Sequence, residues 1–486
     1  MKANRIFFLL LLLALTVVLL ACGKKNDTAT TAQPTEPHEH TPGEAVVENK
    51  VDKTCTQAGG YDEVVYCLTC GEQISRTYCV LNPYHVYEKS VCVYCGAFCP
   101  SDKLTFTSAN DGTCAVTDIG KCTDTFLVIP EYSPDGDLVT AIGAKAFYEN
   151  ETITKIYLGA NVTQIDESAF CGCINLLSVI VDGQNPAYTA IDDSLYSKDG
   201  KTLVQYAIGK TDTEVSVAQS VERIGSGAFR FAKHIRSVYI PKSVVQIGEG
   251  AFGWLPSLQS ITVEASNEAY LSLDGSLYTK DIKTLMQYAI GKADTAFILP
   301  QQVERIAFGA FAFCESLQNV SLSPALESIG RNAFYGCRSL LAITLPDTVC
   351  DVAYGAFAYC ESLTELTFPA LVDKIDEAVA FGCTNLQSVS VLGEITSIAY
   401  CAFAYCKSLT AFVVPSTVVS IGEGAFFECD LLQAVYIPIS VQTIGLFAFD
   451  LCPLLTIYCQ AQRMPAGWDE AWFTLPCTVV WGSTMP

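Results

Sequence analysis

Apolar and polar positions alternate in short segments that return every 23 residues over most of the chain. In one copy Leu340, Ile343 and Leu345 are apolar, whereas Ala342 and Thr344 fall on the opposite face of an extended strand. A proline ends this segment and several others, because proline cannot donate to a strand ladder. The pattern predicts one short strand in each repeat, with one buried and one outward face.

Two further rows of residues keep the same period. A unit of this size cannot bury its own apolar side, so successive units must stack. The sequence therefore predicts a β-rich solenoid of 23-residue repeats over residues 101–486, with buried phenylalanines and with buried thiols as small filler rather than disulfides. The two rows are Cys314, Cys337, Cys360, Cys383, Cys406, Cys429 and Cys452, and Phe147, Phe170, Phe229, Phe252, Phe311, Phe334, Phe357, Phe403, Phe426 and Phe449.

Two related stretches, 194–206 and 276–288, interrupt the period. Each lies in an interval of 59 residues between equivalent phenylalanines. Asp199-Gly200 in the first stretch is a strong hairpin signal. The second stretch has Ile282 in place of the glycine, so we expect a different turn there. The solenoid is thus predicted to carry two β-hairpin insertions.

The C-terminal half departs from the repeat at two places. Ala380 occupies a position where the other repeats carry phenylalanine, and Phe381 follows one residue later. We expect a local bulge or cavity there, with Phe381 turned inward to fill it. Near the C-terminus, Trp468, Trp472 and Trp481 are expected to close the open end of the core.

The N-terminus is typical of an export signal. Residues 1–21 begin with Lys2 and Arg5, continue through an unbroken apolar run and end in Leu-x-Ala before Cys22. This ending resembles the bacterial lipobox, which implies that Cys22 becomes the first mature residue and carries a lipid. The chain is then expected to be held on a membrane by the lipid anchor alone, without a spanning segment.

Residues 22–50 are rich in Thr, Pro, Glu and Ala. This composition predicts a flexible tether between the anchor and the folded part. The histidines His38 and His40 within it are interpreted as part of a solvated linker rather than as metal ligands.

Residues 51–100 form a Cys-rich module with two C-x-x-C-G sequences. Their spacing matches a zinc ribbon, in which the thiolates of Cys67, Cys70, Cys92 and Cys95 would surround one structural zinc ion. Disulfide bonds are the alternative, because small exported domains are often built around them. The sequence leaves both interpretations open. Neither makes the module catalytic, since four protein ligands leave no open coordination position.

The remaining chemistry indicates a binding protein rather than an enzyme. The net charge of −22 argues against nucleic acid, whose phosphates require a basic surface. The G-x-G-x-x-G sequence at 248–253 arises from the repeat itself, without the strand and helix that a dinucleotide site needs. No metalloprotease, nucleophile-elbow or Walker motif occurs in the sequence.

The outward face of the predicted strands is the candidate binding face. Small hydroxyl side chains with tyrosines at both ends would form a flat, weakly charged platform that suits an extended protein or a glycan. Simple β-propensity on a solvated face explains the same residue types, and this alternative remains open. The candidate residues are Tyr157, Tyr239, Thr262, Ser321, Thr344, Thr367, Ser390 and Tyr436.

The repeat L-x-x-I-x-L-P-x-x-V-x-x-I-G-x-x-A-F-x-x-C resembles the BspA-like, or Treponema-type, leucine-rich repeats of bacterial surface proteins. The resemblance covers about residues 103–486 and implies a cell-surface lipoprotein that binds an extracellular or host protein and acts in adhesion. Two alternatives are a glycan-capturing lipoprotein for nutrient uptake and a passive structural spacer. The resemblance specifies the fold more closely than the ligand.

Overall fold

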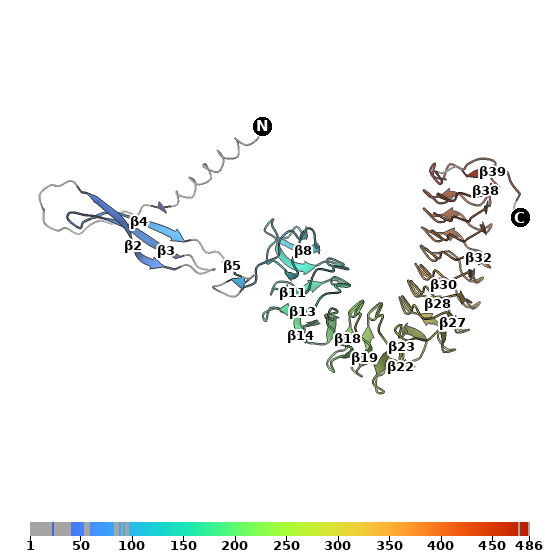
Figure 1. Cartoon of the computed structure of the whole chain (residues 1–486), viewed down its shortest axis with the longest axis horizontal. Coiled ribbons are helices and arrows are strands. Elements are labelled where there is room, and N and C mark those ends of the chain that lie inside the picture. Colours follow the sequence, from blue (N-terminus) through green and yellow to red (C-terminus); the bar gives the residue numbers. More distant parts are fainter. Residues whose placement is uncertain are drawn as a thin grey trace. The chain divides into compact units, whose positions relative to one another are not determined.

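The chain contains two compact units, Met1–Pro100 and Ser101–Pro486. In the described residues every regular element is a strand (Figure 1). The predicted signal segment 1–21 lies outside the described residues. The computed structural model describes residues 22–23, 40–52, 59–81, 87–88, 91–92, 97–474 and 477–484.

The N-terminal unit contains an antiparallel sheet with the strand order β1-β4-β3-β2, and a separate antiparallel pair β5-β6. Strands β2, β3 and β4 follow one another in both the sequence and the sheet, and β1 pairs with β4 at the other edge. Their bounds are β1 (Cys22–Gly23), β2 (Pro42–Val51), β3 (Gly59–Cys67), β4 (Gln73–Leu81), β5 (Tyr87–Glu88) and β6 (Val91–Cys92).

Strand β2 lies largely within the predicted tether 22–50, so the ordered module begins earlier than the predicted residue 51. Charged side chains connect this strand to its neighbours. The Arg76 guanidinium contacts Glu48 on β2 at 2.7 Å and Asp62 on β3 at 2.6 Å. Strand β2 is mostly exposed, and its apolar residues Ala45, Val46 and Val47 are adjacent, so its sequence lacks the apolar alternation that would have predicted a strand. Residues 24–39 of the tether lie outside the described part.

The predicted repeat strands form in the C-terminal unit and pair in parallel with their equivalents one repeat away. We call them the first-series strands. They are β9 (Phe126–Val128), β11 (Lys155–Leu158), β13 (Ser178–Val181), β17 (Glu214–Ser216), β19 (Ser237–Ile240), β21 (Ser260–Val263), β25 (Ala296–Ile298), β27 (Asn319–Ser321), β29 (Ala342–Ile343), β31 (Glu365–Phe368), β32 (Ser388–Val391), β34 (Ala411–Val413), β36 (Ala434–Ile437), β38 (Thr456–Cys459) and β39 (Thr478–Trp481).

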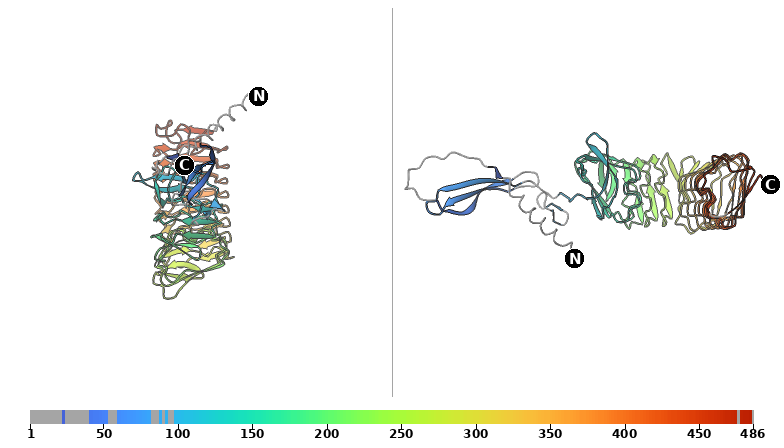
Figure 2. Two further views of the ribbon diagram at one scale, coloured as in Figure 1. Left: turned by 90° about the vertical axis from the view of Figure 1, so that its left-hand side faces the viewer. Right: turned by 90° about the horizontal axis from the view of Figure 1, so that it is seen from above.

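A second series of short parallel strands forms just before the Ile-Gly turns, and the antiparallel β7 (Thr105–Ser108) borders it at the N-terminal end. Successive turns therefore stack as a solenoid, which bends along its length (Figures 1 and 2). The second-series strands are β8 (Thr113–Asp118), β10 (Leu138–Ile142), β12 (Gln164–Ile165), β18 (Arg223–Ile224), β20 (Gln246–Ile247), β26 (Arg305–Ile306), β28 (Ser328–Ile329), β30 (Asp351–Val352), β33 (Ser397–Ile398), β35 (Ser420–Ile421) and β37 (Thr443–Ile444).

The phenylalanine row runs through the core between these two series, as predicted. All ten rings of the row are buried. Neighbouring rings stack: Phe311 and Phe334 have centroids 4.8 Å apart, and Phe334 and Phe357 have centroids 5.4 Å apart. The ring-to-ring distance matches the spacing of paired strands, so each repeat within a run supplies one ring to the stack, which is interrupted at the two insertions and at Ala380.

Each insertion adds three antiparallel strands, and the third of them joins the second series in parallel. The solenoid bends in the region of these insertions (Figure 1). The strands are β14 (Tyr188–Ile191), β15 (Ser194–Ser197) and β16 (Thr202–Gln205) in the first insertion, and β22 (Tyr270–Leu273), β23 (Ser276–Thr279) and β24 (Thr284–Gln287) in the second.

The turn between β23 and β24 does not differ from its counterpart, so that expectation is wrong. Ile282 adopts φ 59°, close to the 70° of Gly200. The cause is the aspartate that precedes this position in each turn, because both aspartates make the same hydrogen bond. Oδ1 of Asp199 accepts a bond from the Lys201 N–H at 3.0 Å, and Oδ1 of Asp281 accepts the equivalent bond at 3.0 Å. These bonds hold a β-branched residue in the left-handed conformation it normally avoids.

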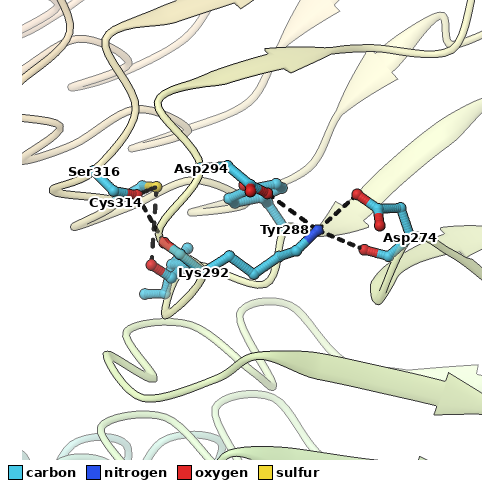
Figure 3. Close-up of polar contacts among 7 residues, drawn as sticks. Asp274, Tyr288, Lys292, Asp294, Cys314 and Ser316 are labelled. Atoms are coloured by element: carbon cyan, nitrogen blue, oxygen red, sulfur yellow. Dashed lines mark hydrogen bonds and ion pairs between the residues drawn. The ribbon is translucent and has the colours of Figure 1, made fainter.

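A charged cluster fastens the second insertion to the adjoining repeat (Figure 3). Nζ of Lys292 lies 2.6 Å from Asp274 on the hairpin and 3.2 Å from Asp294 on the repeat. The Tyr288 hydroxyl donates to Asp294 at 3.2 Å, and the Ser316 hydroxyl donates to the Lys292 carbonyl at 2.8 Å. Burial opposes the charge of Lys292, but its bonds to the two aspartates outweigh this and raise its pKa. The cluster therefore serves to fix the insertion.

In the repeat that has Ala380 in place of a core phenylalanine, the core is not filled by the residue that the sequence predicted. Ala380 is fully buried, but Phe381 does not turn inward. Its ring is half-buried and lies 5.3 Å from Tyr359 and 5.0 Å from Tyr405, between centroids. Inside the core, Phe368 from strand β31 approaches Phe403 with centroids 6.5 Å apart. The larger strand residue thus fills part of the space that the alanine leaves.

The C-terminal cap closes the core with tryptophans, as expected. Trp468 and Trp472 are buried. The ring of Trp472 packs edge-on against Phe449, the last ring of the stack, with centroids 5.8 Å apart. The Trp468 indole N–H donates to the Val441 carbonyl at 3.2 Å, which satisfies its one polar group.

Candidate recognition surfaces and a metal-ligand cluster

The predicted binding-face residues occupy equivalent outward positions on the first-series strands. Thr262, Ser321, Thr344, Thr367 and Ser390 are exposed. The register places some of them directly side by side: Tyr239 is paired with Thr262, and Thr367 is paired with Ser390. We call this set, with Tyr157 and Tyr436, the strand-face column. The residues of the column therefore lie where the strand pattern places them, and their role in binding remains a prediction.

The tyrosines of the strand-face column are held in place. The Tyr157 hydroxyl donates to Asp182 Oδ2 at 2.8 Å, and the Tyr239 hydroxyl donates to Glu264 Oε2 at 3.3 Å. Burial, followed by the bond to Asp182, raises the pKa of Tyr157 to about 12. The ring of Tyr436 stacks on Tyr458, with centroids 4.9 Å apart. The sequence analysis missed Tyr458 because the step between the two tyrosines falls to 22 residues.

A second row of aromatic rings, which the sequence alone did not indicate, follows the turns after the core phenylalanines. These half-buried rings touch one another in tilted or edge-to-face arrangements along the solenoid, with centroids 4.6–5.6 Å apart. Phe231, Trp254 and Phe313 all lie two residues after the core phenylalanine, and from Phe313 onward the rings alternate between the two x positions of A-F-x-x-C, so no single column of the sequence contains them. They are Phe231, Trp254, Phe313, Tyr335, Tyr359, Phe381, Tyr405 and Phe427.

At one end of this row the turns surround a cavity of ≈ 550 Å³, which we call the aromatic hollow. Residues as far apart as Tyr148 and Tyr354 line it. The Arg230 guanidinium lies 3.4 Å from the centre of the Trp254 ring, a close cation–π contact. In the described part of the chain, Nε of Arg230, Nε1 of Trp254 and Oδ1 of Asn332 are buried without a hydrogen-bond partner. Such groups are costly in a purely structural setting.

The cysteine row lies beside the phenylalanine stack and is buried, as predicted. Each thiol also makes a contact that the sequence did not reveal. The Cys337 thiol donates to the Phe311 carbonyl at 3.2 Å, and Cys360, Cys383, Cys406, Cys429 and Cys452 repeat this contact one repeat further each time. Burial raises the pKa of Cys383 to about 12. These thiols are small core residues with a weak hydrogen bond.

The structure describes three of the four predicted zinc ligands. Cys67 and Cys70 lie at the two ends of one turn, and their ligand atoms form a group with His40 in which all separations are within 4.8 Å. Among the described residues this group does not include Cys92, which lies on β6. Cys95 lies outside the described residues, so the predicted four-thiolate set remains a prediction. The sequence did not indicate that His40 belongs to this group of ligand atoms, because its composition placed the residue in a tether.

The family model for the BspA-type leucine-rich repeat region matches six copies, over residues 201–272, 291–410 and 396–464. These residues make up just over half of the chain. The chain belongs to the BspA-type leucine-rich repeat family. The resemblance inferred from the repeat is thus confirmed, together with the predicted solenoid fold.

Solved structures similar to this BspA-type chain are also bacterial leucine-rich repeat proteins. A leucine-rich repeat protein from Eubacterium ventriosum is 20% identical, with 79% of this chain and 95% of that chain covered and a TM-score of 0.46. The pneumococcal vaccine antigen PcpA is 19% identical, with coverages of 79% and 98% and a TM-score of 0.42. A leucine-rich cell surface protein from Faecalibacterium prausnitzii is 20% identical, with coverages of 79% and 96% and a TM-score of 0.33. A comparison with curated proteins gave no match.

BspA-type repeats form scaffolds for binding, and the described surfaces of this chain agree with that use. Over the residues that the structure describes, no helix has both the length and the apolar character needed to span a bilayer. The interpretation that the protein is not an enzyme remains a prediction.

Proposed function

We propose that this BspA-type protein is a lipid-anchored cell-surface adhesin that binds an extended extracellular or host protein through the strand-face column. The single observation that supports this most is the column itself. Exposed hydroxyl groups and anchored tyrosine rings lie at equivalent positions on the first-series strands, and within each sheet neighbouring strands lie about 4.8 Å apart. A row with this spacing offers regular hydrogen-bonding and apolar contacts to a partner that lies along the solenoid.

The rigidity of the column favours binding. Tyr157 and Tyr239 are already fixed by carboxylates, so a partner would not have to order their side chains. Tyrosine is also enriched among the residues that dominate protein interfaces. The column carries hydroxyl and phenol groups, although the chain as a whole has a net charge of −22. Contact with a partner is therefore not obstructed by like charges within the column itself.

Replacement of Tyr157, Tyr239 and Tyr436 by alanine is expected to weaken binding of the full-length protein to immobilised fibronectin by about 100-fold. We assign about 1 kcal/mol to each ring, as is usual for an aromatic contact in an interface. Surface plasmon resonance measures the change. The matched control replaces Tyr132 and Tyr400, which are also exposed but lie outside the column, and should bind as the parent does. Equal binding by the triple variant and the parent would reject the strand-face proposal.

Replacement of Cys22 by serine is expected to abolish incorporation of labelled fatty acid into the protein. Serine cannot form the thioether that carries the lipid. Growth of the cells with labelled palmitate, followed by immunoprecipitation, measures the label on the protein. Cys99→Ser is the control, because this cysteine is far from the N-terminus and should leave the label unchanged. A Cys22→Ser protein that still carries the label would contradict the lipid anchor.

Glycan capture is a second candidate function, and the aromatic hollow favours it. Sugars stack on aromatic rings, and the hollow is lined by Tyr148, Trp254 and Tyr335 together with the cationic Lys145 and Arg331. A glycan array separates the two candidates. If the protein captures glycans, Trp254→Ala should abolish the array signal while the triple tyrosine variant retains it.

A further inference from the structure

The segment from Cys67 to Glu72 folds as a knuckle that presents two sulfur atoms together. The Cys67 N–H donates to the Glu72 carbonyl at 2.7 Å, and the Gly71 N–H donates to the Cys67 carbonyl at 2.9 Å. Gly71 adopts φ 75°, which glycine accepts without strain. The Thr69 N–H points at the Cys67 sulfur at 3.4 Å. An N–H group directed at a thiolate stabilises its charge.

A separate part of the chain brings an imidazole to this knuckle. Strand β2 pairs with β3 so that Pro42 lies opposite Cys67. Just before β2, the Thr41 carbonyl accepts a bond from the Leu68 N–H at 2.9 Å. These backbone contacts fix His40 beside the sulfurs, with Nδ1 3.5 Å from Cys70 Sγ.

The separation fits a common metal. In a tetrahedral zinc site with Zn–S near 2.3 Å and Zn–N near 2.0 Å, sulfur and nitrogen ligands lie about 3.6 Å apart. The observed distance between His40 Nδ1 and Cys70 Sγ is 3.5 Å. All three ligand atoms of His40, Cys67 and Cys70 lie within 4.8 Å of one another. Small movements of side chains are therefore enough to enclose one ion.

The second nitrogen of the imidazole faces a carboxylate. Nε2 of His40 lies 3.7 Å from Glu72 Oε2, within ion-pair distance but longer than a hydrogen bond. A carboxylate on this side favours the tautomer with its proton on Nε2, in which the Nδ1 lone pair faces the sulfurs and is more basic. The same Oε2 atom lies 3.8 Å from Cys70 Sγ.

We propose that His40, Cys67 and Cys70 bind one Zn²⁺ ion, with Glu72 as the carboxylate that orients the imidazole. A set of one imidazole and two thiolates selects zinc over magnesium or calcium, which prefer oxygen ligands. The fourth position of the tetrahedron is taken by water. In this arrangement His40 takes the place assigned to the Cys92–Cys95 pair in the zinc-ribbon prediction. The ion links the start of β2 to the turn between β3 and β4.

The test is a competition for Zn²⁺ between the full-length reduced protein, purified in detergent, and a colorimetric chelator. The parent is expected to bind one zinc ion per chain. His40→Ala, Cys67→Ser and Cys70→Ser should each weaken binding by more than about 100-fold, because loss of a direct ligand exceeds loss of an outer partner. Glu72→Gln should weaken it by about 10- to 100-fold, and Glu63→Gln, on the neighbouring strand, should have no effect.

One further variant distinguishes loss of a zinc ligand from loss of folding. His40→Cys supplies a thiolate at the same position and should retain zinc that His40→Ala loses. Cys92→Ser and Cys95→Ser test the four-thiolate alternative and should bind zinc as the parent does. If these two cysteine variants lose zinc while His40→Ala keeps it, the four-thiolate site is correct and our assignment is overturned. A reduced parent protein that binds no zinc would overturn it equally.

Discussion

Raising the pH from 8 to 10 is expected to lower the free energy of unfolding of the solenoid steeply. Burial raises the pKa of Cys337, Cys360, Cys406 and Cys429 well above that of an ordinary thiol, and that of Cys383 to about 12. In the unfolded chain these thiols titrate near pH 8.5. Above that pH the unfolded state loses protons that the folded state keeps, so stability falls as the pH rises. The stabilising contribution is complete below pH 8.5 and is lost as the pH rises through the folded-state pKa.

The size of this effect follows from the number of thiols. Each contributes about 1.4 kcal/mol per pH unit between the unfolded and folded pKa values, so five together contribute about 7 kcal/mol per pH unit. Urea unfolding, followed by circular dichroism at several pH values, measures the slope. The variant Cys360→Ala/Cys383→Ala should lower the slope by about 3 kcal/mol per pH unit. An unchanged slope in this variant would show that the buried thiols do not cause the pH dependence.

Replacement of Phe334 by alanine is expected to lower the free energy of unfolding by about 3–5 kcal/mol. The ring is 1% exposed and stacks between Phe311 and Phe357. Its removal takes away the buried apolar area and also leaves a cavity, because the neighbouring repeats hold their rings in place. Urea unfolding at pH 7 measures the loss.

The matched control for this change is Leu341→Ala. This side chain lies seven residues further along the same repeat and is 46% exposed. Its replacement should change the free energy of unfolding by no more than about 0.5 kcal/mol. A loss below about 1 kcal/mol for Phe334→Ala would mean that the phenylalanine stack does not support the solenoid.

The repetitive part of the fold could be predicted from the sequence because the same residues recur at a fixed step. Phe334 belongs to the phenylalanine row and Cys337 to the cysteine row. When similar units stack, residues at the same position of each unit lie beside one another, so each row is buried as a whole. The Phe381 prediction failed because the core at Ala380 depends on Phe368, which lies on a strand and belongs to another column of the sequence. The expectation of a different turn at Ile282 was wrong for a related reason: Asp281, which precedes it, holds the turn in the same conformation whatever residue follows.

The candidate sites could be predicted only in part. The strand-face column follows from alternation along each strand. The aromatic hollow depends on contacts between turns from distant repeats, such as those of Tyr148 and Tyr335, and no local pattern indicates them. The cluster of His40 with Cys67 and Cys70 depends on strand pairing over 27 residues or more, through a strand β2 that is mostly exposed. Composition alone had placed His40 in a tether.

Contact between the strand-face column and the partner can be mapped by hydroxyl-radical footprinting of the full-length protein with and without bound fibronectin. We expect fibronectin to protect Tyr157, Tyr239 and Tyr436 from oxidation and to leave Trp254 and Tyr335 unchanged. Protection of Trp254 and Tyr335, with the three strand-face tyrosines oxidised as in the free protein, would show that the partner binds elsewhere.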